Sequence, residues 1–138
     1  MKRLTLFIFL AFLMVACGNG LHEEVVSTFK NGQAAVVRVY DKDHQWIAER
    51  QYYETGMLMM EGSIKDGQRD GAWTSYFPDG KVQSTGFFEQ GRRVGDSKVY
   101  HENGNLYMEG PYKDDHHCGN WKIYDEQGYL LQEIDYGE

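Results

Sequence analysis

Proline is almost absent from this chain of 138 residues, and so are the sequence motifs of common enzymes. Two prolines are too few for a polyproline or collagen-like chain. The motifs Gly-x-Ser-x-Gly and His-Glu-x-x-His and the phosphate-binding loop are missing, so the enzyme classes that they mark are not indicated. We therefore predict a protein that is not an enzyme and carries no cofactor.

Glycine and aromatic residues, in contrast, are abundant. The chain holds 16 glycines, and 14% of its residues are aromatic. Interior glycine costs a helix about 1 kcal/mol relative to alanine, whereas a disordered chain would be poor in aromatic rings. The composition therefore favours a small protein built from strands and turns.

The N-terminus has the pattern of a secretory signal. Met1-Lys2-Arg3 is basic, and residues 4–16 are apolar except for Thr5. This segment is too short to cross the roughly 30 Å hydrocarbon core as a helix, but it fits a signal peptide. Its end, Leu13-Met14-Val15-Ala16-Cys17, resembles a bacterial lipobox, in which the cysteine is acylated and becomes the mature N-terminus. The alternative is an ordinary signal peptide with an incidental cysteine.

These features divide the chain into three predicted parts: a lipoprotein signal peptide over residues 1–16, the lipidated Cys17 with a tether over residues 17–27, and a repeat domain over residues 28–138. Removing the signal takes away Lys2 and Arg3, so the formal net charge of −7 becomes −9. An acidic chain is unsuited to nucleic acid and to anionic headgroups, so membrane attachment would come from the acyl chains. Cys118 would then have no disulfide partner within the chain.

The remainder of the chain repeats itself every 24 residues. A stretch that runs from tyrosine to glycine recurs at residues 52–56, 76–80, 100–104 and 124–128. Another glycine follows six residues after each of the first three stretches, at Gly62, Gly86 and Gly110. Trp73 and Trp121 hold equivalent places, with Ser97 between them. Residues 28–51 form a degenerate first copy.

Each unit has the pattern of a β-hairpin. Turn sequences such as Pro78-Asp79-Gly80 separate short strands rich in aromatic and apolar residues. A type I turn followed by a glycine bulge and a two-residue turn at Asp79-Gly80 both fit, so the register stays open. The second strands are predicted at residues 82–88, 106–112 and 130–136. Mid-strand glycines indicate places where a ring, Trp73 or Trp121, lies close over the backbone.

The units resemble MORN repeats of the bacterial variant type. The resemblance is carried by residues 71–80, preceded by Glu61-Gly62 and Lys65-Asp66-Gly67, and it covers residues 28–138. Ser97 in place of tryptophan and Asp115 in place of glycine depart from the pattern. The resemblance implies an all-β fold, an elongated single-layer antiparallel meander of stacked hairpins. It also implies non-enzymatic contacts with proteins or membranes, and some bacterial members resemble antitoxin or immunity proteins.

Two sets of aromatic residues are candidates for a binding face. One is a ladder of tyrosines at the same position of successive units: Tyr52, Tyr76, Tyr100 and Tyr124. The ladder can pack across strands, bind a partner through ring area and hydroxyls, or do both. The other set is Trp73 and Trp121, which can belong to the core or to a contact surface.

One run, Asp114-Asp115-His116-His117-Cys118, has the chemistry of metal ligands. Adjacent ligands reach poorly around a tetrahedral Zn²⁺, and earlier units have a variable polar loop at this place. We therefore predict no metal site. His117 and Cys118 are neighbours in sequence, which does not by itself make a catalytic pair.

The sequence leads to three functional hypotheses. The first is a lipid-anchored, non-catalytic scaffold that binds another protein at the bacterial cell envelope. The second is an antitoxin or immunity protein whose acidic, aromatic surface neutralises a basic toxin, and the third is a structural spacer. We expect a monomer. Gly18, after Cys17, is not the aspartate of some inner-membrane retention signals, which favours the outer membrane.

Overall fold

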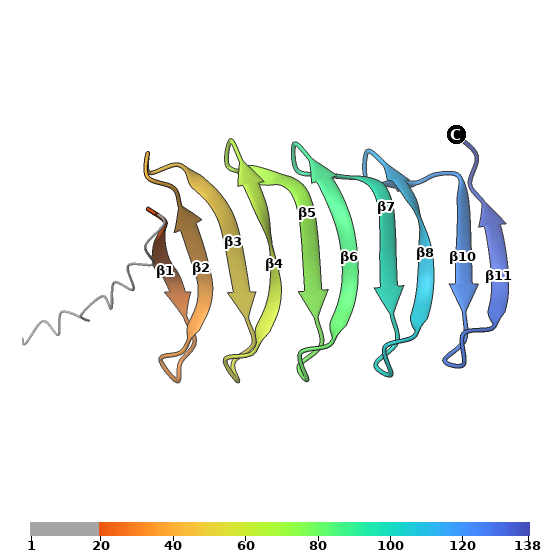
Figure 1. Ribbon diagram of the computed structural model, residues 1–138, viewed down its shortest axis with the longest axis horizontal. Coiled ribbons are helices and arrows are strands. Elements are labelled where there is room, and N and C mark those ends of the chain that lie inside the picture. Colours follow the sequence, from red (N-terminus) through yellow and green to blue (C-terminus); the bar gives the residue numbers. More distant parts are fainter. Residues whose placement is uncertain (1–19) are drawn as a thin grey trace, which may run out of the picture.

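The computed structural model describes residues 20–138, and within them eleven strands form one antiparallel sheet. Consecutive strands pair with each other, except that the short β9 pairs only with β8 and leaves β10 beside β8. Figure 1 shows the strands side by side in a single layer, in chain order. The strands are β1 (His22–Thr28), β2 (Ala34–Tyr40), β3 (Trp46–Tyr52), β4 (Leu58–Lys65), β5 (Gln68–Tyr76), β6 (Val82–Glu89), β7 (Arg92–Tyr100), β8 (Leu106–Lys113), β9 (His116–His117), β10 (Asn120–Tyr124) and β11 (Leu130–Asp135). This arrangement confirms the predicted meander of hairpins.

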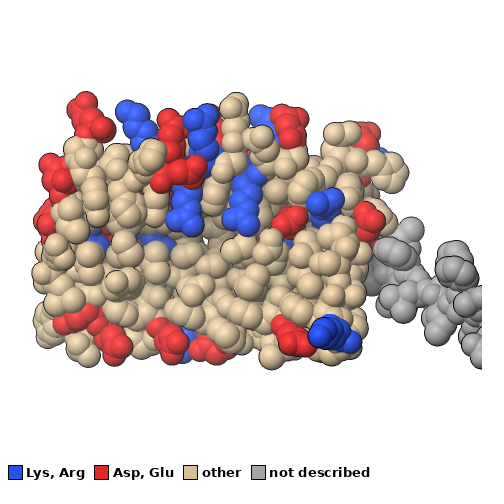
Figure 2. Space-filling view, turned by 180° about the vertical axis from the view of Figure 1, so that it is seen from behind, with Lys and Arg blue, Asp and Glu red and all other residues tan. Residues whose placement is uncertain are grey.

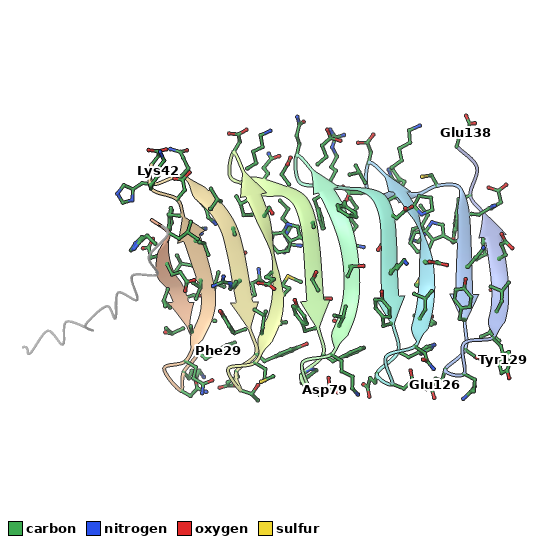
Figure 3. All side chains as sticks on the ribbon, viewed as in Figure 1. Phe29, Lys42, Asp79, Glu126, Tyr129 and Glu138 are labelled. Carbon is green, nitrogen blue, oxygen red and sulfur yellow. The ribbon has the colours of Figure 1, made fainter. Side chains whose placement is uncertain are left out.

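The hairpins close through a turn followed by a glycine bulge. All these turns lie along one side of the sheet, where strands end, and we call this side the glycine-bulge edge (Figure 1). Between β5 and β6, Gly80 N–H donates to the Phe77 carbonyl and Phe77 N–H donates to the Lys81 carbonyl, both at 2.8 Å. Gly80 has a φ of 87°, and the register shifts between Ser75 and Tyr76. The turn with a bulge is therefore the form adopted. Figure 3 shows this edge with Phe29, Asp79, Glu126 and Tyr129, and Lys42 at the opposite edge.

At the opposite edge, two-residue turns join β4 to β5, β6 to β7 and β8 to β9. Both residues of each turn have positive φ: Asp66 and Gly67 (51° and 77°), Gln90 and Gly91 (49° and 82°), Asp114 and Asp115 (49° and 68°). Such turns match the right-handed twist of the strands that they join. Asp115 therefore holds, at some conformational cost, a position that glycine occupies in the two earlier turns.

The repeat array begins earlier than the sequence analysis predicted. The sequence predicts a tether over residues 17–27, but strand β1 begins at His22 and pairs with β2 from His22 to Thr28. The prediction was wrong because β1 precedes the first recognisable glycine turn and carries none of the repeat's aromatic marks. Of the predicted tether, only residues 20 and 21 fall within the described part of the chain and outside a strand.

The hydrophobic core is thin because one sheet has no second layer to pack against. The buried hydrophobic residues in the described part of the chain are Val37, Val39, Ile64, Trp73 and Trp121. Each strand therefore depends on the strands beside it for support, as in other solenoid-like repeat proteins.

Candidate functional site: a groove on the tryptophan face

The two faces of the sheet carry different residues. Trp73 is paired with Gly62 on β4 and Gly86 on β6, and Ser97 on β7 is paired with Gly110 on β8. Because paired residues point to the same side of a sheet, these positions share one face. We call it the tryptophan face. The opposite side, which we call the tyrosine face, carries the neighbouring residues of each strand.

The tyrosine ladder lies on the tyrosine face and is tied to the sheet by hydrogen bonds. Tyr76 Oη donates to Glu61 Oε1, and Tyr124 Oη donates to Glu109 Oε1, both at 3.0 Å. Burial, followed by the hydrogen bond to Glu61, raises the pKa of Tyr76. The same two causes, with Glu109 as the acceptor, raise the pKa of Tyr124. These hydroxyls are engaged within the sheet, which supports a packing role for the ladder.

Tyr52 and Tyr100 hold the same place as Tyr76, each at the last position of its strand and half-buried. Charged residues run beside the ladder on the same face. Arg50 Nη1 lies 2.6 Å from Glu23 Oε1, and Lys98 Nζ lies 3.8 Å from Glu109 Oε2. The hydrogen bond to Glu23 raises the pKa of Arg50. The tyrosine ladder is therefore flanked by charged side chains that pair with one another.

Trp73 and Trp121 belong to the core. Their exposed fractions are 5% and 2%, and each indole lies flat over a glycine of the preceding strand. A Cβ added to Gly62 would overlap the ring of Trp73, and a Cβ added to Gly110 would overlap the ring of Trp121. The predicted close approach is confirmed. Both indoles pack within the sheet and expose little surface, whereas a contact role for them stays a prediction.

A groove of about 400 Å³ opens on the tryptophan face between the two tryptophans. Its lining includes Met60, Phe88, Val99, Met108 and both indoles, with Arg69 and Arg93 among the lining residues as well. Figure 2 looks onto this face and shows a broad uncharged band below a few Lys and Arg side chains. The groove is therefore lined by apolar and aromatic side chains together with polar ones, among them Ser75, Gln83, Ser84 and Ser97, and it has positive charge on one side.

The groove exists because one tryptophan of the repeat is missing. At Gly86, the equivalent of Gly62 and Gly110, an added Cβ would meet only Ser97, with Oγ at 3.5 Å and Cβ at 3.8 Å. Ser97 Oγ donates to the Thr85 carbonyl at 3.1 Å, so the small side chain stays close to the sheet. The space that an indole fills in the units on either side is open here.

The run of metal-ligand residues is spread over separate contacts. Asp114 pairs with Arg92 at 3.1 Å, and Asp115 Oδ1 accepts the Arg93 N–H at 2.8 Å. The His117 ring packs against Trp121 with centroids 4.1 Å apart and the ring planes tilted by 46°, while Cys118 is half-buried. Within residues 20–138, no three His, Cys, Asp or Glu side chains are grouped to hold a metal ion.

The groove itself was missed by sequence reasoning, although its signal was present. Ser97 was recognised as a departure from the repeat, yet the departure was not interpreted as an open space. The signal is that this unit keeps Gly86 although it has lost the tryptophan. Glycine is needed at this repeat position only where a ring packs on it. Cys17 and the proposed lipobox lie outside the described residues. Across residues 20–138, we find no helix with the length and apolar character needed to cross a membrane.

Fold and groove together define a class: a β-hairpin repeat protein with one layer, two chemically distinct faces and a recess where a repeat residue is lost. Three stretches, residues 48–66, 69–90 and 93–114, match the family described as MORN repeat variant. They coincide with the β3–β4, β5–β6 and β7–β8 hairpins. The chain therefore contains a MORN repeat variant domain.

A comparison with curated proteins gives no match. Among solved structures, the chain is similar to the crystal structure of TarM, with 14% sequence identity and a TM-score of 0.34. The alignment covers 70% of this chain and 21% of the TarM chain. The chain thus spans about a fifth of the length of that solved protein.

Proposed function

We propose that the protein is a non-catalytic scaffold that binds another protein on its tryptophan face, held at the bacterial cell envelope by lipid on Cys17. The groove carries this proposal. It is a recess of about 400 Å³ on a broad face, with Arg69 and Arg93 among its lining residues. Concave, mostly apolar surfaces with a few polar groups are the usual form of binding sites.

The chemistry of the groove favours binding over catalysis. Its hydroxyl-bearing residue at the missing tryptophan position, Ser97, donates to the main-chain carbonyl of Thr85. Arg93, at the rim, donates from Nη1 to Tyr112 Oη at 3.2 Å. A nucleophile needs an adjacent base within hydrogen-bond reach, whereas both of these side chains have partners that only hold them in place.

Two adjacent phenylalanines provide a matched test of which face binds. Phe88 lies on the tryptophan face, paired with Gly71, whereas Phe87 points to the tyrosine face and is 50% exposed. Each is replaced in turn by the photo-cross-linking residue p-benzoylphenylalanine, which keeps a phenyl ring. We expect the Phe88 probe, and not the Phe87 probe, to form one discrete cross-linked complex in the native cell. Equal labelling from both positions would contradict the proposed binding face.

The anchor is supported by Leu13-Met14-Val15-Ala16-Cys17, which has the form of a lipobox. Cys17→Ser removes the thiol that would be acylated, so the variant is expected to stay uncleaved or to leave the membrane fraction. Cys118→Ser is the matched control and is expected to fractionate like the wild type. Unchanged fractionation and processing of Cys17→Ser would contradict lipid anchoring.

A second function, an antitoxin or immunity protein, is favoured by the net charge of −7, which becomes −9 without Lys2 and Arg3. An acidic surface accelerates encounter with a basic partner, and the acceleration weakens with salt. The partner cross-linked through Phe88 would then be a basic protein that is toxic when expressed alone. A non-toxic partner would leave the general scaffold as the function.

A further inference from the structure

The MORN repeat variant units of this chain build the same aromatic site three times, at Trp73, Ser97 and Trp121. In the first and last, the indole lies on a glycine, and its Nε1–H donates to a main-chain carbonyl one strand away. Trp73 donates to Ser63 and Trp121 donates to Pro111, both at 3.0 Å. These carbonyls are 48 residues apart, which is two repeats, so they are equivalent positions.

Each indole is also covered from above by the residue four positions before it. The Arg69 guanidinium carbon lies 4.1 Å from the centre of the Trp73 ring, and the His117 ring centroid lies 4.1 Å from that of Trp121. An aromatic ring then packs edge-on against each indole. Phe88 does so against Trp73 at 6.1 Å, and Tyr112 does so against Trp121 at 5.1 Å.

The middle site keeps every one of these surrounding groups and lacks the indole. Gly86 provides the flat base, and an added Cβ there would meet nothing closer than Ser97 Oγ at 3.5 Å. Phe87 lies 24 residues after Ser63 and 24 residues before Pro111, so its carbonyl is the equivalent of those two acceptors. Phe87 lines the groove. Because its ring points to the tyrosine face, the part of Phe87 that reaches the groove is its backbone.

The cover and walls of the middle site are present as well. Arg93 is the equivalent of Arg69, and its guanidinium carbon lies 6.0 Å from the ring centre of Phe88 and 5.3 Å from that of Tyr112. The guanidinium thus lies between two aromatic walls with no indole beneath it. Cations over aromatic faces and edge-on aromatic pairs both favour a planar ring in such a place.

We propose that this open site, which we call the indole slot, binds the tryptophan side chain of the partner protein. The incoming indole lies on Gly86 under Arg93, between Phe88 and Tyr112, and its N–H donates to the Phe87 carbonyl. The inference rests on the proposed function and deepens it by naming what the groove takes. A side chain, rather than a free small molecule, is favoured because the recess continues over Met60, Val99 and Met108, which gives the rest of a partner segment apolar surface to cover.

The slot is tested with N-acetyl-tryptophanamide, which carries the side chain between two peptide groups. Amide signals in two-dimensional NMR are followed while the probe is added to the protein with residues 20–138. We expect saturable shifts at Gly86 and Ser97, with a dissociation constant on the order of 1 mM for a single small ligand. The amide of Gly62, whose site is filled and which lies two strands away from Gly86, is expected to keep its position in the spectrum. Absence of saturable shifts at Gly86 and Ser97 would overturn the proposal.

Filling the slot from within the chain provides the specificity control. Ser97→Trp restores the repeat residue, so it is expected to raise the melting temperature and to abolish the shifts. Asp96→Ala changes the exposed neighbouring residue on the tyrosine face, leaves the slot open and is expected to bind like the wild type. If Ser97→Trp does not fold, Gly86→Val fills the slot from its base and is expected to abolish the shifts. Persistent binding by a folded, filled variant would contradict the slot.

A third experiment distinguishes a tryptophan side chain from free indole as the ligand of the slot. Free indole that binds where N-acetyl-tryptophanamide does not would contradict a protein side chain as the occupant. N-acetyl-leucinamide is the apolar control, and equal binding would contradict recognition of an aromatic ring. Failure of the indole slot is distinguishable from failure of the scaffold, since cross-linking through Phe88 reports protein binding whether or not tryptophan is the residue recognised.

Discussion

Three glycines at one repeat position have different roles in this sheet. Gly62 and Gly110 each support an indole, and an added Cβ would overlap that ring. A Cβ added to Gly86 would meet only the small side chain of Ser97, at ordinary contact distance. None of the three has a positive φ, so the backbone does not require glycine at any of them. Glycine is required at Gly62 and Gly110 because a ring packs on them, and no ring packs on Gly86.

Alanine substitutions at these three positions should therefore differ in their effect on the free energy of unfolding. Gly62→Ala and Gly110→Ala force the indole off the strand, which we expect to cost about 1–3 kcal/mol of unfolding free energy, as other overpacked cores do. Gly86→Ala is the matched control. It is expected to be neutral or to stabilise by about 0.4–1 kcal/mol, because alanine restricts the unfolded chain. Urea unfolding measures all three, and a loss in Gly86→Ala equal to that in Gly62→Ala would be inconsistent with an open slot.

The tyrosine hydroxyls predict a response to alkaline pH. Burial and hydrogen bonds to Glu61 and Glu109 raise the pKa of Tyr76 and Tyr124 in the folded state. A raised folded pKa contributes stability that is present below the unfolded pKa of about 10 and is lost as the pH rises through the folded value. Unfolding free energy is therefore expected to fall in this range. The Tyr76→Phe, Tyr124→Phe double variant should lose less over the same interval, and parallel curves would contradict the assignment.

At the scale of the elements, successive hairpins are joined at both edges of the sheet. At the glycine-bulge edge, Tyr53 Oη donates to the Tyr76 carbonyl and Asn103 Nδ2 donates to the Glu126 carbonyl, both at 2.8 Å. At the other edge, Arg93 N–H donates to Asp115 Oδ1 at 2.8 Å. Each of these bonds connects one repeat to the next. The turns therefore fix the spacing of the hairpins as well as closing them.

Asp115 combines this connection with an unfavourable backbone, since its φ is 68°. Asp115→Gly loses the acceptor for Arg93 N–H but fits the backbone, whereas Asp115→Ala loses the acceptor and keeps the strain. We expect the alanine variant to be less stable than the glycine variant by about 1 kcal/mol, the cost of a left-handed residue with a Cβ. Thermal unfolding of the pair measures this difference. Equal stability would mean that the strain is relieved elsewhere.

Much of the hairpin architecture could be predicted because glycine and aromatic spacing reports it directly. The choice between two turns could not, since Asp79-Gly80 suits both and only the bond from Phe77 N–H to the Lys81 carbonyl decides. Strand β1 was missed because its sequence pairs with β2 without carrying the marks of the repeat. The groove was missed for a related reason: a missing side chain becomes a space only when its neighbours, Phe88 and Tyr112, are placed.

At the scale of the whole molecule, the sheet is a row of nearest-neighbour contacts. Strands pair only with adjacent strands, and one layer leaves both faces open to solvent. Cross-strand pairs such as Arg50 with Glu61 at 3.5 Å add little individually, because exposed ion pairs contribute about 0–1 kcal/mol. Stability should then be a sum over hairpins and their interfaces. A complete unit should be removable without loss of the fold.

Deletion of residues 81–104 removes one period of 24 residues and tests this additivity together with the slot. The deletion joins Gly80 to Asn105, so β5 pairs with β8 and Trp73 lies opposite Gly110 in place of Gly86. Gly86 and Ser97 are both lost. We expect a folded sheet with a lower melting temperature and no binding of N-acetyl-tryptophanamide, as measured by circular dichroism and NMR.

Deletion of residues 81–103 is the matched control, because it removes one residue fewer. A shift of one residue sends every side chain of β8 to the other face, so Met108 and Gly110 would no longer lie on the tryptophan face. We expect this variant to fail to form the sheet. If both deletions folded equally well, the 24-residue phase would not be what positions the two faces. If the in-phase deletion folded and still bound the probe, the indole slot would lie elsewhere.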